Sequence, residues 1–137
     1  MNVGGIIQRQ FDALRYRWPQ ATLAEMDCAA GSYKLIVPNV PLRKGDWDRT
    51  HTTVGSIIPL GFPQASPSRF FVEKALSKSH GGMLNNTIDN HDFGSDFYEI
   101  KYGHMAVWTP NKDTLTTVVR FVVQQLWRIN RMGEVRS

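Results

Sequence analysis

The chain has 137 residues, 42% of them hydrophobic and 20% charged, a balance typical of one soluble globular domain over residues 1–137. Polar residues interrupt its most apolar stretch, so no membrane span is expected. The N-terminal residues lack a basic region followed by an apolar block, and the single cysteine, Cys28, can form no internal disulfide; both features predict a cytoplasmic protein. The net charge of +4 comes without a long basic run, which argues against nucleic acid as the main partner.

The first expected element is an amphipathic helix over residues 4–18, which Pro19 ends. Its apolar residues recur at helical spacing, at Ile7, Phe11, Leu14 and Trp18. Three arginines lie away from this stripe: Arg9, Arg15 and Arg17. They form either a solvated polar face or a basic surface for a partner.

A meander of four antiparallel strands is expected next, at Ala21–Cys28, Tyr33–Val37, Thr52–Ile58 and Arg69–Glu73. Residues 29–32 read as the turn between the first two strands. Trp47 stands between two aspartates in a polar tip before the third strand. An exposed indole in such a tip is typical of a partner contact, and folding back onto the sheet is the alternative.

Three prolines within nine residues precede the fourth strand, at Pro59, Pro63 and Pro67. They cannot lie inside a central strand, because proline has no N–H for the ladder. The aromatic residues beside them, such as Phe62, are too apolar to be left in solvent. We therefore expect a proline-locked turn between two apolar strands.

Residues 74–96 show little periodicity and many Gly, Asn, Ser and Asp residues, which predicts a long surface loop. Loops of that length inside a domain are more often functional or mobile than idle. A short strand is expected at Phe97–Lys101, and a second amphipathic helix from Asp113 onward. This order predicts an α+β fold with the helices on one side of an antiparallel sheet.

The order and motifs of these elements resemble the ubiquitin-conjugating enzyme (UBC) family. Phe62-Pro63, then Pro67 and Phe71, match its aromatic-Pro, second proline and aromatic strand end, although Ser66 replaces the first proline of the usual pair. Trp108-Thr109-Pro110 matches the Trp-Ser/Thr-Pro that opens the helix after the active site. The resemblance implies an N-terminal helix, a four-stranded meander, a long active-site-region loop and a C-terminal helix.

The chain departs from the usual members at the nucleophile. The family's cysteine lies shortly before the Trp-Ser-Pro motif, where Ile100 and Lys101 stand here, and the preceding His-Pro-Asn is missing. The chain looks closer to a prokaryotic branch, which Tyr98-Glu99 and His104 match loosely. That branch is associated with bacterial pathways built from a ubiquitin-like protein, an activating enzyme and a metalloprotease. The resemblance thus implies a modifier and an activating enzyme as partners.

Three functions follow from these observations. The leading hypothesis is a UBC-like component that binds a modifier or activating enzyme without a cysteine thioester and needs no cofactor. Its expected partner-binding residues are Arg9, Arg15, Arg17, Trp47, Phe62, Pro63 and Pro67, and its fold motif is Trp108 and Pro110. The second hypothesis is an active conjugating enzyme with an unconventional nucleophile. The third is a small basic nucleic-acid-binding α+β protein.

The candidate catalytic residues are Cys28, Lys101 and His104. Cys28 reads more simply as a small buried hydrophobe, and as a nucleophile it would need a rearranged site. Lys101 stands near the usual cysteine position and is either a solvated strand-end lysine or a site for an isopeptide bond to the modifier. His104 would orient a modifier tail or hydrogen-bond the backbone.

A metal site is not expected. The histidines and acids of the second half match no known ligand spacing: His80, His91 and His104 with Asp89, Asp92, Asp96 and Glu99.

Overall fold

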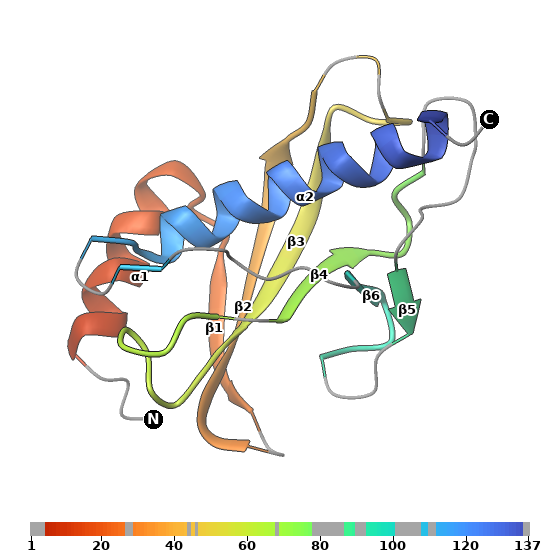
Figure 1. Ribbon diagram of the computed structural model, residues 1–137. Coiled ribbons are helices and arrows are strands. Elements are labelled where there is room, and N and C mark those ends of the chain that lie inside the picture. Colours follow the sequence, from red (N-terminus) through yellow and green to blue (C-terminus); the bar gives the residue numbers. More distant parts are fainter. Residues whose placement is uncertain are drawn as a thin grey trace.

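The structure is a computed structural model that describes residues 5–26, 29–43, 45, 47–67, 69–77, 87–89, 93–100, 108–109 and 112–135; for 29–31, 89 and 127–135 the description is of the backbone alone. Within these ranges the elements are α1 (Gly5–Arg17), β1 (Thr22–Met26), β2 (Ala29–Pro41), β3 (His51–Ile58), β4 (Arg69–Glu73), β5 (Thr87–Asp89), β6 (Phe97–Ile100) and α2 (Leu115–Val135) (Figure 1).

The strands form one antiparallel sheet in the order β1-β2-β3-β4-β6-β5. The α+β class and the antiparallel meander are confirmed, but the expected number of four strands is wrong. The structure describes six, because β6 adds to β4 and β5 adds to β6. Strand β5 falls inside the expected 74–96 loop. It is not predicted from the sequence, because three residues are too few to show a period of alternating residues.

Residues 29–32, expected to be a turn, belong instead to β2. The pairing of Met26 with Ala29 across β1 and β2 leaves only two residues between the strands. A bulge lies between Val37 and Val40, where Asn39 has a φ of 61°. The extra residues turn Val40 into the core, where it is 1% exposed.

Helix α1 forms for the reasons that its sequence predicts. Ile7, Phe11 and Leu14 are its buried residues, and Pro19 follows directly after Trp18, whose N–H still bonds to the Leu14 carbonyl at 3.0 Å. The two arginines in its last turn complement the negative end of the helix dipole.

Helix α2 begins at Leu115, and Thr114 is its N-cap, since its carbonyl accepts the first helical bond, from Val118 N–H. The Thr117 hydroxyl accepts the Thr114 N–H at 3.0 Å. Gln10 of α1 accepts the Leu115 N–H at 3.0 Å, so one helix caps the other.

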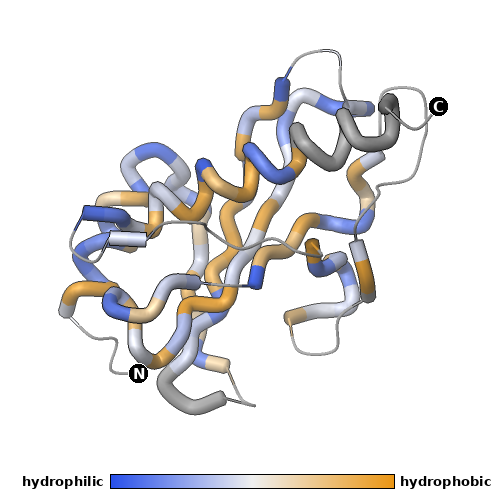
Figure 2. The backbone as a smooth tube through the Cα atoms, in the orientation of Figure 1, coloured by the Kyte–Doolittle hydropathy of each residue, from blue (hydrophilic) through white to orange (hydrophobic). Residues whose placement is uncertain are grey.

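One face of the sheet packs against both helices. Alternate strand residues, among them Leu35, Val54 and Phe70, join the inner residues of α1 and α2 in a single apolar core. Helix α2 crosses this face and α1 lies beside its N-terminal end (Figure 1). Apolar and polar stretches alternate along the helices and central strands, as an element with one buried face requires (Figure 2).

The opposite face is closed by a smaller aromatic cluster. Phe71 and Phe93 are fully buried and stack with centroids 4.1 Å apart at 8°, and Phe97 meets Phe93 edge-on. Gly55 of β3 lies directly under Phe93, because a Cβ at that position would be 2.2 Å from the ring. Segment 93–97 therefore covers the centre of this face of the sheet.

Among the described residues, no helix combines the length and apolarity needed to cross a membrane.

Candidate functional site

The proline-rich connection between β3 and β4 is a closed turn. Its backbone bonds join Phe62 N–H to the Pro59 carbonyl at 3.0 Å and Ala65 N–H to the Gly61 carbonyl at 2.9 Å. The Phe62–Pro63 peptide bond is cis. Phe62, Pro63 and Pro67 are all buried. The prolines end the ladder and the aromatic side chain anchors the turn to the core, so residues 59–67 form one fixed corner beside the sheet.

Trp108 packs on this corner. Its indole ring centroid lies 5.7 Å from that of Phe62 at 54°, and its Nε1–H donates to the Pro63 carbonyl at 2.7 Å. The two motifs are 45 residues apart in the sequence, yet they contact each other by a ring and a hydrogen bond. We call this contact of Phe62, Pro63 and Trp108 the aromatic corner.

The aromatic corner leads directly into α2. The Thr109 N–H donates to the Asp113 carboxylate at 2.7 Å, and the Asp113 N–H returns to the Thr109 carbonyl at 2.9 Å. This turn aims the chain into the helix, whose N-terminus Gln10 caps from α1. The aromatic corner, the Thr109–Asp113 turn and the two helices are thus linked by contacts between described residues.

The three candidate catalytic residues, Cys28, Lys101 and His104, lie outside the described residues. Pro110 also lies outside them. The described residue just before the connection, Ile100, is buried and ends β6. The nearest described residues on either side of Cys28 are Met26 and Ala29, which pair with each other where β1 meets β2. Strand β1 is one edge of the sheet, and β6 is four strand positions away, or about 19 Å at ordinary strand spacing.

The arginines of α1 are exposed, as their positions off the apolar stripe predict. The Arg15 Nε donates to the Pro19 carbonyl at 3.3 Å, and the Arg17 guanidinium lies 5.2 Å from the centroid of the Trp18 ring. Arg9 makes no hydrogen bond or ion pair with any residue of the described part. None of the three makes an ion pair there, so their charges face solvent and are open to an acidic partner.

The expectation of an exposed indole at Trp47 is wrong. Trp47 is only 6% exposed and belongs to the main core. The charged residue after it explains why, since the Asp48 carboxylate turns to bond with Arg49 and with the Ser77 N–H. The Asp48 carboxylate thus finds its hydrogen-bond partners within the protein, while the Trp47 ring packs in the core. Trp47 is therefore not part of the surface that we consider below.

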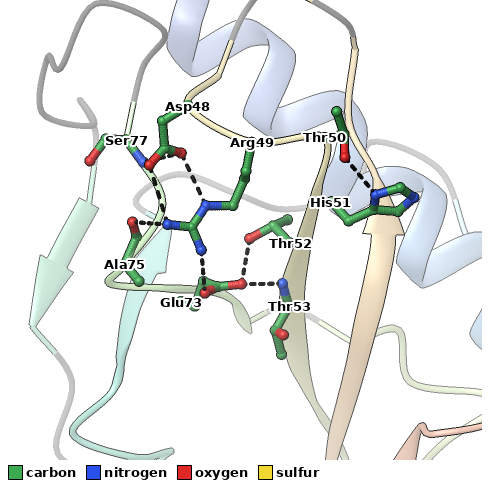
Figure 3. Close-up of polar contacts among 9 residues, drawn as sticks. All are labelled: Asp48, Arg49, Thr50, His51, Thr52, Thr53, Glu73, Ala75 and Ser77. Atoms are coloured by element: carbon green, nitrogen blue, oxygen red, sulfur yellow. Dashed lines mark hydrogen bonds and ion pairs between the residues drawn. The ribbon is translucent and has the colours of Figure 1, made fainter.

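A polar network, missed by sequence reasoning, joins residues 48–53 to residues 73–77 (Figure 3). We call it the polar strap. Glu73 is its centre, because its carboxylate accepts the Arg49 guanidinium at 3.1 Å, the Thr52 hydroxyl at 2.8 Å and the Thr53 N–H. Arg49 also bonds to Asp48 and donates to the Ala75 carbonyl at 2.7 Å. The ion pairs hold the chain after Trp47 against the end of β4.

The ion pair between Asp48 and Arg49 shifts the pKa values of both residues. The Arg49 guanidinium, by its hydrogen bond, lowers the pKa of the Asp48 carboxyl below its ordinary value, with a smaller contribution from the Ser77 N–H. The same hydrogen bond from Asp48 raises the pKa of Arg49. The pair is partly exposed, with about a third of each side chain in contact with solvent. Asp48 and Arg49 are therefore both ionised at neutral pH.

Within the described ranges, no group of three or more His, Cys, Asp or Glu side chains is placed to hold a metal ion. Glu99 is paired with Arg69 at 2.7 Å instead. His80, His91 and Asp92 fall outside the described residues.

The fold is consistent with that of a ubiquitin-conjugating-like protein. A family model described as prokaryotic E2 family E matches residues 20–128, which is most of the chain, and the chain belongs to that family. No curated protein and no solved structure matches it. The matched range begins after α1, so the family match does not include the arginines of that helix. Membership suggests a role in ubiquitin-like conjugation and, in general, contact with modifiers or activating enzymes.

Proposed function

We propose that this protein is a component of a bacterial ubiquitin-like modification pathway that binds the modifier or its activating enzyme without forming the usual cysteine thioester. One observation carries the proposal. The aromatic corner that flanks the family's active site is intact, with the Trp108 indole bonded to Pro63 at 2.7 Å, while residues 100–107 contain no cysteine.

The chemistry of thioester transfer supports this reading. The reaction needs an exposed thiolate that a second thioester can reach. The neighbours of the only cysteine, Met26 and Ala29, lie in the hairpin of an edge strand. A lysine amine that attacks a thioester forms an amide rather than a new thioester, so Lys101 does not supply the usual thioester intermediate.

A binding role also fits the surface. The side chains of Arg9, Arg15 and Arg17 lie exposed on one helix and have no acidic partner among the described residues. Such a basic helix attracts an acidic domain, and the net charge of +4 adds to the attraction over longer distances. The aromatic corner supports the neighbouring connection rather than contacting a partner through Phe62, because that ring is only 7% exposed.

The experiment is a binding titration of the full chain with the activating enzyme and the ubiquitin-like protein of the same bacterium. We expect binding to at least one of them. We expect the triple change Arg9→Glu, Arg15→Glu and Arg17→Glu to weaken binding by tenfold or more, at roughly 0.5–1 kcal/mol for each pair lost.

The matched control reverses three exposed cations outside α1, at Arg43, Lys74 and Lys112. It changes the net charge equally and is expected to leave the affinity within about threefold. Equal weakening by both triple variants would remove α1 as the surface. Absence of binding to either partner would overturn the proposal itself.

A further inference from the structure

A pocket of about 230 Å³ opens between three elements that the partner surface above does not use together. Arg17 and Trp18 border it from the end of α1, and Val40 and Pro41 from the end of β2. Helix α2 closes it with Val119, Arg120 and Val123. The pocket therefore joins residues about 100 positions apart, and neither helix alone contains it.

The base of the pocket is apolar and well packed. Trp18, Val40 and Val119 are each less than 10% exposed, so their side chains are held in the core. The bulge in β2 directs Val40 to this place, and Asn39 beside it donates to the Gln20 side chain at 3.1 Å. The apolar walls are thus fixed by main-chain geometry and core packing. They offer a preformed surface for an apolar side chain.

The rim of the pocket is cationic. Arg17 and Arg120 come from the two helices, and the lining contains no acidic residue. The Arg17 guanidinium lies over the Trp18 ring, which orients it beside the opening. Arg120 makes no hydrogen bond or ion pair with any residue that the structure describes, and it is exposed. Two guanidinium groups with ten N–H donors between them favour a carboxylate.

The volume decides which kind of ligand fits. A pocket of about 230 Å³ is smaller than the roughly 300–1,000 Å³ of ordinary cofactor and small-molecule sites, which favours a small group such as a side chain over a cofactor. It has room for one or two side chains. A ligand must then place an apolar group on the base and a negative charge at the rim.

We propose that this pocket binds a short acidic peptide segment of a partner protein, with an apolar side chain against Pro41 and Val123 over the apolar base and a neighbouring carboxylate held by Arg17 and Arg120. The inference does not depend on the pathway assigned above, because it needs only a peptide of this chemistry. It adds a specific apolar anchor to an attraction that charge alone would leave unspecific.

The test is a nuclear magnetic resonance titration of the ¹⁵N-labelled full chain with capped nonapeptides. The probes carry one leucine, isoleucine or phenylalanine between two glutamates in a glycine-serine background. We expect at least one of them to bind with a Kd below about 1 mM and to shift the indole N–H signal of Trp18, assigned with Trp18→Phe. Replacing glutamate by glutamine, or the apolar residue by serine, is expected to weaken binding at least fivefold.

The variant Arg120→Glu is expected to weaken the best peptide at least tenfold, since it replaces one of the two rim cations by a repelling charge. Lys112→Glu is the matched control, because it is an exposed cation outside the pocket with the same change in charge, and it should alter the affinity less than twofold. Thermal melting of both variants checks that each is folded.

Absence of binding by every probe would overturn the inference. So would equal weakening by Arg120→Glu and Lys112→Glu, or equal binding of the glutamine peptide. Competition by inorganic phosphate as effective as the peptide would reduce the pocket to a general anion site and would also overturn it.

Discussion

Two connections on the molecule, the aromatic corner and the polar strap, fix neighbouring segments by opposite means. The aromatic corner joins Phe62 and Pro63 to Trp108 by buried ring contacts and one neutral hydrogen bond. The polar strap joins residues 48–53 to residues 73–77 through charged groups that remain partly exposed. The contact at the aromatic corner is thus apolar and nearly independent of pH, whereas the strap depends on charged groups and solvent screening.

The largest expected effect is at the aromatic corner. Phe62→Ala removes a buried aromatic ring that packs against Trp108, and we expect it to lower the free energy of unfolding by about 3–5 kcal/mol. Urea denaturation measures the change. Leu60→Ala, in the same turn but 73% exposed, is the matched control and should change it by less than about 0.5 kcal/mol. Equal losses for the two variants would contradict the packing described for the corner.

The next effect is at the centre of the polar strap. Glu73→Ala leaves the Arg49 guanidinium, the Thr52 hydroxyl and the Thr53 N–H without their shared acceptor. We expect a loss of about 2–3 kcal/mol in urea denaturation. Glu73→Gln keeps one acceptor oxygen and should lose about half as much. A loss below about 0.5 kcal/mol for the alanine variant would show that the network does not stabilise the fold.

A smaller effect separates the two connections by their response to salt. Trp108→Phe keeps an aromatic ring but removes the donor to the Pro63 carbonyl, at a cost of about 1 kcal/mol. Because this bond is neutral, the cost should be the same at 0.05 M and 1 M NaCl. The cost of Glu73→Ala should shrink at the higher salt concentration. The same salt dependence for both variants would remove the distinction between the connections.

The smallest effect tests ionisation in the strap. Asp48 has a lowered pKa in the folded protein, so its charge stabilises the fold above the ordinary pKa, and that contribution is lost as the pH falls through the folded value. The pair is partly exposed, so Asp48→Asn should cost at most about 1 kcal/mol at pH 7. In thermal melting, the difference from the wild type should vanish near pH 2. A difference that grows on acidification would reverse the assigned sign.

The proline-locked turn at residues 59–67 could be predicted from the sequence, whereas its contact with Trp108 and the polar strap could not. Prolines and aromatic residues restrict the chain locally, so the turn at residues 59–67 and the apolar stripe of α1 are visible without a structure. Glu73 and Arg49 become partners only when β3 and β4 pair, and ordinary charged residues carry no sign of that. The same reason explains Trp47, because the partners that the fold supplies for Asp48 cannot be seen in the sequence.

Strand β5 and the pocket could not be predicted from the sequence for related reasons. Strand β5 has three residues, which is too short for a period, and pairing with β6 creates it. The turn expected at residues 29–32 is part of β2 instead, at a register shift where Glu25 pairs with Tyr33 and Met26 with Ala29. Arg17 and Arg120 lie on different helices, and only the packing of α1 and α2 against β2 brings them to one opening.

We propose that this protein carries no modifier thioester, although the aromatic corner beside the family's usual cysteine position is present. The most direct test of this proposal is the intact mass of the full chain after incubation with the activating enzyme, ATP and the ubiquitin-like protein of the same bacterium, with Cys28→Ala beside it. The account predicts an unchanged mass for both proteins, together with non-covalent binding. An added modifier mass that reducing agent removes, and that Cys28→Ala abolishes, would contradict it and identify an active conjugating enzyme.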